Sequence, residues 1–245
     1  MARILSCAVV VGLALLWAAT ASAGGLYVQE LATPRNGTAQ AGQAAYAYDA
    51  ATAFYNPAGM SRLEKPRWLI GFQPFITDIE FDLKGTTTFD GGEGSQQGGA
   101  LPTLGAYYAH PLNDRWALGA ALVGISGGAL NPDNDWAGRF YITDLSLMAL
   151  ALNPVVSFRV NDWLSLGFGV SLNYGRLDFE ITTPNLLGPE GNVQFESVDD
   201  FEESFNAGIL IEPSENTRIG LAYRSKVDFD LTGDVDVNDP SPLLQ

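Results

Sequence analysis

The sequence predicts an all-β fold, a transmembrane antiparallel β-barrel of the outer-membrane type. Apolar residues recur at every second position over long segments, short and long connections alternate between these segments, and the chain begins like a secretory signal. These observations divide the chain into a signal peptide at 1–23, an N-terminal plug or hatch at 24–65, and barrel strands over 66–245.

The composition disfavours the commonest enzyme chemistries. The chain of 245 residues has a formal net charge of −15, one histidine (His110) and one cysteine (Cys7). Zinc sites of Cys and His and histidine-based triads therefore lack ligands and bases. The acidic balance offers no basic stripe for nucleic acid. We expect no enzyme activity, no cofactor, no metal site and no nucleic-acid partner.

The first 23 residues have the three parts of a cleaved signal. Arg3 supplies a positive charge, residues 4–17 are apolar, and Ala21-Ser22-Ala23 has the small-x-small form of a cleavage site before Gly24. A membrane anchor is the alternative, but the apolar stretch is short for a helix of about 20 residues. Cleavage removes Cys7, so the mature chain can form no disulfide.

The strands are predicted from an alternation of period two. Between 163 and 174 the even positions are apolar and the odd positions are small or polar, which suits a strand with a different solvent on each side. The phase of the pattern inverts after Pro74 and near Gly175, where we expect an inserted residue, as in a β-bulge. Seven strands are predicted, at about 67–83, 102–110, 115–125, 145–160, 163–181, 204–212 and 217–233.

The connections favour a barrel over a soluble β-sandwich. Tight turns at 110–115, 160–163 and 212–216 alternate with long connections at 84–101, 126–144 and 182–203. Outer-membrane barrels have short periplasmic turns and long outer loops. A sandwich needs neither this asymmetry nor such long strands. Aromatic residues near the strand ends would form the interfacial girdle: Tyr107, Tyr108, Trp116, Trp163, Tyr174 and Tyr223.

The segment before the first strand is rich in small residues and only weakly amphipathic. About 40 such residues make a poor free-standing domain. We expect them to plug the barrel lumen, because small side chains allow close packing against a wall; a loose periplasmic tail is the alternative.

Three segments resemble one family in order along the chain. They are residues 31–62 with Tyr55-Asn56-Pro57-Ala58-Gly59-Met60, the pair Trp136-Ala137-Gly138-Arg139-Phe140 and 152–158, and residues 212–225. Together they resemble the FadL-type outer-membrane transporters of Gram-negative bacteria.

The resemblance implies a fourteen-stranded barrel, closed by an N-terminal hatch, for passive uptake of hydrophobic molecules. Long-chain fatty acids are the best-known substrates, and some relatives take up aromatic hydrocarbons. The ligand would pass from an outer groove to an inner site and leave through a gap in the wall. The hatch motif maps onto Asn56, Pro57, Ala58 and Gly59. The implied surroundings are outer-membrane lipid, lipopolysaccharide and the barrel assembly machinery.

Seven predicted strands are half of fourteen, and a closed single-chain bacterial barrel normally has an even number of strands. We therefore expect this chain to be the N-terminal portion of a larger barrel. A degenerate gene and a half-barrel that needs a partner are the alternatives.

The outer loops supply the candidate ligand contacts. Trp136, Arg139, Phe140, Tyr141, Leu186 and Leu187 are apolar or cationic residues in the second and third long connections. The alternative is that they fold the loops over one another, with Arg139 paired to Asp133 or Asp135 instead of a ligand carboxylate. An alternative function is that of a structural or adhesive surface protein with no transport activity.

Overall fold

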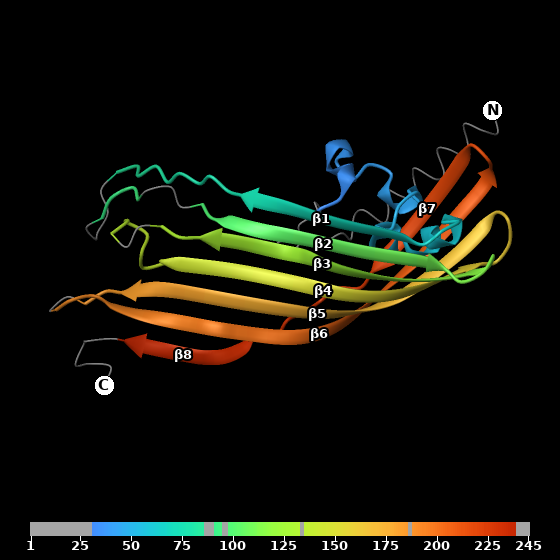
Figure 1. Ribbon diagram of the computed structural model, residues 1–245. Coiled ribbons are helices and arrows are strands. Elements are labelled where there is room, and N and C mark those ends of the chain that lie inside the picture. Colours follow the sequence, from blue (N-terminus) through green and yellow to red (C-terminus); the bar gives the residue numbers. More distant parts are fainter. Residues whose placement is uncertain (1–30, 86–90, 95–97, 133–134, 186–187, 239–245) are drawn as a thin grey trace, which may run out of the picture.

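The computed structural model describes residues 31–85, 91–94, 98–132, 135–185 and 188–238, so the predicted signal peptide lies outside the described residues. It contains one curved sheet of eight antiparallel strands (Figure 1). The strands are β1 (Arg67–Ile76), β2 (Ala100–Pro111), β3 (Trp116–Leu130), β4 (Asp144–Arg159), β5 (Leu164–Thr183), β6 (Gly191–Ser214), β7 (Thr217–Arg224) and β8 (Thr232–Asn238).

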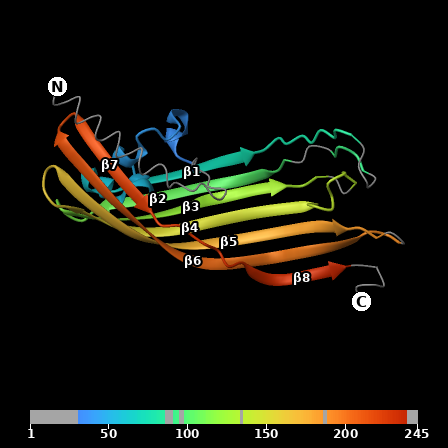
Figure 2. The ribbon, with the colours of Figure 1, turned by 180° about the vertical axis from the view of Figure 1, so that it is seen from behind.

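The sheet is a meander in which β1 to β7 follow one another in chain order, which confirms the predicted antiparallel wall. The predicted strand 217–233 is wrong in one respect, because it is divided into β7 and β8. Both of these pair with β6, β7 near one end of it and β8 near the other (Figures 1 and 2).

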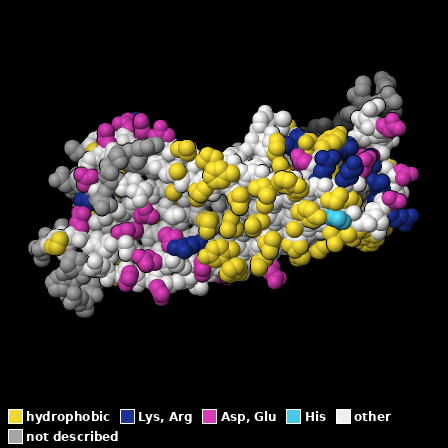
Figure 3. Space-filling view, in the orientation of Figure 1, with side chains coloured by type: hydrophobic (Ala, Val, Ile, Leu, Met, Phe, Trp, Pro, Cys, Tyr) yellow, Lys and Arg dark blue, Asp and Glu magenta, His cyan; other side chains and the backbone are white. Residues whose placement is uncertain are grey.

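The two faces of the sheet are chemically different, as the alternation predicts. On β5, Phe168 and Val170 are each 50% exposed, whereas Ser171 and Asn173 on the opposite face are buried. Figure 3 shows the exposed apolar side chains as a continuous band across the sheet, with acidic side chains gathered beyond the band at the end of the long connections. A band of this kind is the lipid-facing surface of a membrane barrel.

The inserted residue predicted at Pro74 is wrong, and the one predicted near Gly175 lies on β6 instead, where the β5–β6 register shifts opposite Leu177 and Phe179. The β1–β2 register is continuous through Pro74, and the β4–β5 register is continuous through Gly175. The alternation therefore persists, and what changes is the chemistry of each face. Beyond Gly175 the outward positions become charged and the inward positions apolar, because the strand has passed out of the apolar band.

The connections confirm the alternation of short and long, with one correction. Short turns join β2 to β3, β4 to β5 and β6 to β7. The predicted connection 182–203 is mostly strand, since β6 already begins at Gly191. The half of β6 near Gly191 has polar and acidic residues at its outward positions. It therefore lacks the alternation of apolar and polar residues by which the other strands were predicted. Among the described residues, no helix is long and apolar enough to cross a membrane.

The aromatic residues near the short turns behave largely as expected. Tyr108, Trp116 and Trp163 are each about half exposed on the apolar face. Tyr107 is an exception, because it is buried on the opposite face and donates a hydrogen bond to the carbonyl oxygen of Leu31. An adjacent pair on one strand must point to opposite faces, so only one of the two tyrosines can reach lipid.

The N-terminal segment, residues 31–65, packs on the face of the sheet opposite the apolar band. Its short helices gather near the short-turn end (Figures 1 and 2). Their apolar side chains share a core with inward residues of β2, β3 and β4. The helices are η1 (Pro34–Thr38), η2 (Gln43–Ala45), α2 (Thr52–Tyr55) and η3 (Pro57–Arg62).

Glycines on the inner face let this segment approach the wall. A Cβ at Gly208 on β6 would lie 1.9 Å from Asn56 Oδ1, and a Cβ at Gly220 on β7 would lie 2.0 Å from the carbonyl oxygen of Ala44. Four further strands repeat the arrangement with one glycine each: Gly71 on β1, Gly105 on β2, Gly119 on β3 and Gly167 on β5. The segment therefore packs closely on six strands, with its backbone or a side chain against a glycine of each.

We expect Gly208→Ala to destabilise this seating by about 1–3 kcal/mol, because the added methyl group must displace Asn56. Urea unfolding of the intact protein in detergent, followed by gel mobility, measures the change. Gly128→Ala is the matched control, since a Cβ at Gly128 on β3 has nothing within 4 Å. Equal stability of the two variants would contradict close packing at Gly208.

Candidate functional site

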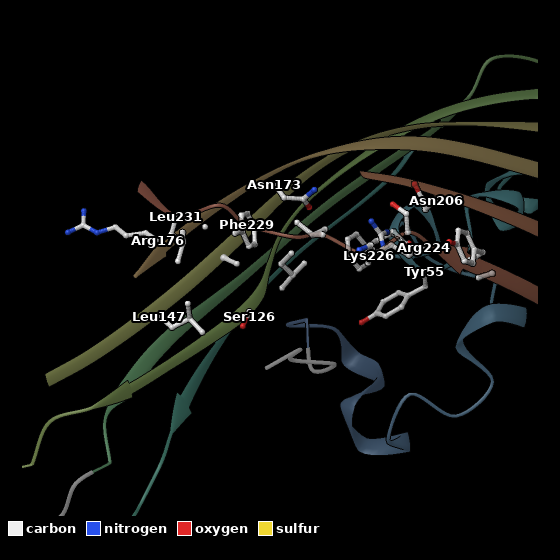
Figure 4. A pocket seen from close by; sticks show the side chains of 18 residues that line it. Tyr55, Ser126, Leu147, Asn173, Arg176, Asn206, Arg224, Lys226, Phe229 and Leu231 are labelled. Atoms are coloured by element: carbon white, nitrogen blue, oxygen red, sulfur yellow. Dashed lines mark hydrogen bonds between the residues drawn. The ribbon is translucent and has the colours of Figure 1, made fainter. Parts of the chain in front are cut away.

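A cavity of about 700 Å³ lies between the inner face of the sheet and the N-terminal segment. Its volume is within the range of about 300–1,000 Å³ that is typical of small-molecule sites. Figure 4 shows Tyr55, Arg224 and Asn206 near one end of it and Arg176 and Leu231 toward the other. It is lined by Phe54, Tyr55, Ile125, Ser126, Leu147, Ala149, Asn173, Gly175, Arg176, Asn206, Ala222, Tyr223, Arg224, Ser225, Lys226, Val227, Phe229 and Leu231.

Among the described residues, the cavity lining is mostly apolar, with neutral polar and cationic members and no aspartate or glutamate. Three lining residues are cationic, but Arg176 occupies an outward position of β5 and the Lys226 side chain is 83% exposed, so Arg224 is the one that extends to the inner end of the cavity. Arg176 and Lys226 form ion pairs with Asp178 and Asp228, which do not line the cavity. Arg224 donates to a backbone carbonyl, a serine hydroxyl and an asparagine amide oxygen.

Arg224 joins the N-terminal segment to the wall at the inner end of the cavity. Its guanidinium donates to the carbonyl oxygen of Phe54 at 2.9 Å, to Ser171 Oγ at 2.9 Å and to Asn153 Oδ1 at 3.3 Å. It also stacks on the Phe54 ring, 3.8 Å from the ring centroid. These contacts hold a positive charge in a fixed position beside an apolar surface.

A buried amide next to Arg224 has an unused donor. Asn153 Nδ2 donates to Asn206 Oδ1 at 3.0 Å, so the Asn206 oxygen is satisfied. Asn206 Nδ2 is buried and has no hydrogen-bond partner in the described part of the chain. An unpaired buried donor costs about 1–3 kcal/mol. The pair Asn206 and Arg224 is therefore suited to an acceptor with negative charge, such as a carboxylate.

The wall is interrupted where β3 borders the cavity. The β2–β3 ladder extends only from Gly105↔Val123 to Pro111↔Ala117. Beyond this ladder, β2 pairs with β1 and β3 pairs with β4 past a bulge at Gly124/Ser126. Ile125 and Ser126 of this bulged stretch line the cavity. The Leu101 side chain lies over Gly127 and covers the interruption, since a Cβ there would be 1.8 Å from Leu101 Cδ2.

The motif Asn56, Pro57, Ala58 and Gly59 is a buried junction and does not line the cavity. Asn56 Nδ2 donates to the carbonyl oxygens of Ala44 and Ile209, at 2.6 and 3.2 Å. Its Oδ1 accepts the Ala58 N–H at 3.1 Å and so caps η3. One asparagine thus links two parts of the N-terminal segment to β6.

The outer-loop residues are organised around Arg139. Its guanidinium makes a bidentate pair with Glu190, with distances of 2.8 and 2.6 Å. The expected pairing with Asp135 is wrong, and Asp133 lies outside the described residues. Thr182 N–H donates to the Arg139 carbonyl oxygen at 3.0 Å. Hydrogen bonding by Arg139 holds the pKa of Glu190 below its ordinary value.

The aromatic residues next to Arg139 make contacts within the connection between β3 and β4. Trp136 is buried, packs edge-on against Phe81 at 5.3 Å and donates its Nε1–H to the carbonyl oxygen of Ile142 at 2.9 Å. Phe140 is half-buried under the Arg139 guanidinium, whereas Tyr141 is 82% exposed. None of these residues lines the cavity, and Leu186 and Leu187 lie outside the described residues.

Sequence reasoning did not identify the cavity residues Asn206, Arg224 and Phe229. Arg224 could have been found from its place on the polar face of an amphipathic strand. Asn206 belongs to the inward phase of β6 in the same way. Phe229 could not have been found, because its period-two position predicts that it faces lipid.

We expect Arg139→Gln to loosen the outer loops, because it breaks a bidentate pair in which the arginine is buried. External protease on intact cells should cleave within 131–143 several-fold faster. Arg176→Gln is the matched control, because its pair with Asp178 is exposed and joins two residues of one strand. Equal cleavage of both variants would contradict a stabilising role of the Arg139–Glu190 pair.

The same pair predicts an acid dependence. Because folding lowers the pKa of Glu190, the stabilisation is complete above the ordinary value of 4.5 and is lost as the pH falls through the lowered value. Pepsin cleavage within 131–143 should therefore accelerate below pH 4.5 in the parent protein. Glu190→Gln should abolish this acceleration. An unchanged pH profile in that variant would contradict the assignment.

The chain matches known proteins over nearly its whole length. The family model described as "Outer membrane protein transport protein (OMPP1/FadL/TodX)" matches residues 14–244. Outer membrane protein P1 of Haemophilus influenzae is 28% identical over 89% of this chain and 57% of its own length. The long-chain fatty acid transport protein of Escherichia coli is 25% identical over 85% of this chain and 53% of its own length.

Solved structures agree with the fold. A Pseudomonas aeruginosa FadL homologue superposes with a TM-score of 0.72 at 24% identity, over 88% of this chain and 56% of that one. The CymD monoaromatic hydrocarbon channel superposes with a TM-score of 0.66 at 17% identity, over 89% of this chain and 59% of that one. This chain thus spans about half the length of the relatives it matches. The chain belongs to the OMPP1/FadL/TodX family of outer-membrane transport proteins, and its place is the outer membrane.

Proposed function

We propose that the intact protein takes up long-chain fatty acids by passive transfer through the barrel, without enzymatic chemistry. The observation that carries this proposal is a mostly apolar cavity with Arg224 and the buried amide of Asn206 at its inner end, in a strongly acidic chain. A lining chosen for a hydrocarbon alone needs no positive charge. The names of the relatives cover both substrate classes, a fatty-acid transport protein and a monoaromatic hydrocarbon channel.

The arrangement supports one orientation of the ligand. The carboxylate would accept hydrogen bonds from Arg224 and Asn206 beside the N-terminal segment. The acyl chain would extend toward Ile125, Leu147 and Leu231, which are apolar lining residues. Charge-assisted hydrogen bonds are worth about 1.5–3 kcal/mol, enough to prefer an acid over its hydrocarbon by about tenfold or more.

Residues 24–65 serve in this proposal as the hatch that closes the direct route through the lumen. Glycine contacts with six strands and the Asn56 junction support a fixed hatch. With that route closed, the ligand would leave sideways through the β2–β3 interruption. Tyr141 and Phe140 would contribute to an outer apolar contact, whereas Trp136 and Arg139 hold the loop that presents them.

The test compares an acid with a hydrocarbon. We expect Arg224→Met in the intact protein to weaken labelled oleate binding by about tenfold or more and to leave toluene binding nearly unchanged. Arg224→Lys should restore part of the oleate affinity, because the charge is kept. Arg115→Met, an exposed arginine outside the cavity, is the control. Equal losses for oleate and toluene would contradict a carboxylate site, and no binding of either by the parent would contradict uptake.

The sideways route has its own test. Leu101→Cys with Gly127→Cys places two thiols across the β2–β3 interruption in a mature chain without cysteine. We expect the oxidised variant to bind oleate but to lose uptake in cells that lack their own transporter, and reductant to restore uptake. Full uptake in the oxidised state would contradict passage at this position.

A further inference from the structure

The wall has a second interruption on the far side of the cavity. Between the pairs Asn206↔Arg224 and Asp199↔Thr232, residues 200–205 of β6 have no ladder partner in β7 or β8. The chain facing them, residues 225–231, leaves the sheet. Figure 2 shows this coil crossing the sheet between β7 and β8.

The displaced segment folds inward and closes the cavity. A Cβ at Gly175 on β5 would lie 2.9–3.0 Å from three ring carbons of Phe229, so the ring rests directly on the β5 backbone. Phe229 also packs against the core formed by the N-terminal segment and the wall. Val227, Phe229 and Leu231 line the cavity, and Figure 4 shows Phe229 beside Asn173.

The segment is attached at its ends and held in the middle by apolar contact. Ser225 N–H donates to the Phe205 carbonyl oxygen at 2.9 Å, and Phe205 N–H donates to Ser225 Oγ at 3.0 Å. At the other end, Asp230 N–H donates to Asp200 Oδ2 at 2.8 Å. Between these anchors, Phe229 on Gly175 is the contact that keeps the segment inward. A segment held in this way opens by local motion, without unfolding of the wall.

On the outer side of the interruption, aromatic side chains lie on both sides of one exposed acidic residue, Glu203. Tyr223 and Phe201 are 59% and 61% exposed on the lipid-facing surface, and Phe205 lies between them. The Phe205 and Tyr223 rings are 5.7 Å apart, and the Phe201 ring lies 4.8 Å from that of Tyr174. Aromatic residues therefore border the interruption on the membrane side, while Phe229 and Leu231 border it on the cavity side.

We propose that this interruption is a second opening between the cavity and the membrane, and that residues 225–231 are its gate, with Phe229 as the closing residue. An apolar chain would pass between residues 201–204 of β6 and the displaced segment when the Phe229 ring leaves Gly175. The inference rests on the proposed function for its ligand, an acyl chain. It is distinct from passage between β2 and β3.

The first experiment measures access without any transported ligand. Leu147→Cys, at a lining position of β4 where the cysteine is smaller than the leucine it replaces, is treated in the intact, membrane-embedded protein with a maleimide dissolved in the bilayer and, separately, with a water-soluble maleimide. We expect Phe229→Ala to accelerate labelling by the bilayer reagent at least tenfold and labelling by the aqueous reagent far less. Leu231→Ala is the matched control, a cavity residue of similar character that does not rest on Gly175. Unchanged bilayer labelling in Phe229→Ala would overturn the gate, whether or not the protein transports fatty acids.

The second experiment locks the gate. A Cβ at Gly175 lies 3.0 Å from Phe229 Cγ, so cysteines at both positions come within the roughly 4.5 Å that a disulfide allows. We expect Gly175→Cys with Phe229→Cys to slow oleate uptake several-fold when oxidised and to recover when reduced, with correct folding verified by gel mobility. Equal uptake in both states would overturn the second opening while the parent's uptake still supports the proposed function. Absence of uptake in the parent would remove the proposed function and leave the labelling result to decide.

Discussion

The structure depends on one constraint, that a backbone crossing lipid must satisfy its polar groups within the protein. The constraint explains why each strand from β1 to β7 pairs with the next in antiparallel order and why side chains alternate between the two faces. It also makes any break in the ladder costly, since each unsatisfied group in hydrocarbon costs several kcal/mol. The ladder is nevertheless incomplete between β2 and β3 and between β6 and the β7–β8 connection. Both breaks border the same cavity. The unpaired backbone groups therefore lie where an opening would connect the cavity with the membrane.

The N-terminal segment explains why the inner face carries so many small residues. Six strands each place a glycine where the segment approaches, and serines and asparagines around them satisfy its backbone. Ser157 Oγ, for example, donates to the Ala58 carbonyl oxygen at 3.2 Å. A wall of larger side chains would leave no room, and an apolar wall would leave these carbonyl groups unpaired. The inner face of the wall is therefore shaped to pack against the N-terminal segment. The cavity is the space next to this contact that neither of them fills.

Charge is distributed in a way that serves this arrangement. Acidic residues gather at the end with long connections, where the chain stands clear of lipid (Figure 3). On the inner face, Arg224 donates to the Phe54 carbonyl oxygen, Ser171 Oγ and Asn153 Oδ1. The Arg139–Glu190 pair is a third use of charge, because it joins two loops that are distant in sequence. The protein thus has an acidic end, an apolar band on its outer surface, and a cavity with Arg224 on its inner face.

The sequence by itself determined the fold class, the positions of the strands within the apolar band and the family. These follow from period-two alternation, which requires only that one face meets lipid and the other does not. Tertiary structure alone decided the start of β6 at Gly191, because outside lipid the alternation carries no signal, and the division at 225–231, because the alternation continues through residues that leave the sheet. It also decided the partner of Arg139 and the inward turn of Phe229. Period two assigns Phe229 to lipid, but the ring rests on Gly175, a glycine two strands away that only the folded wall brings within reach.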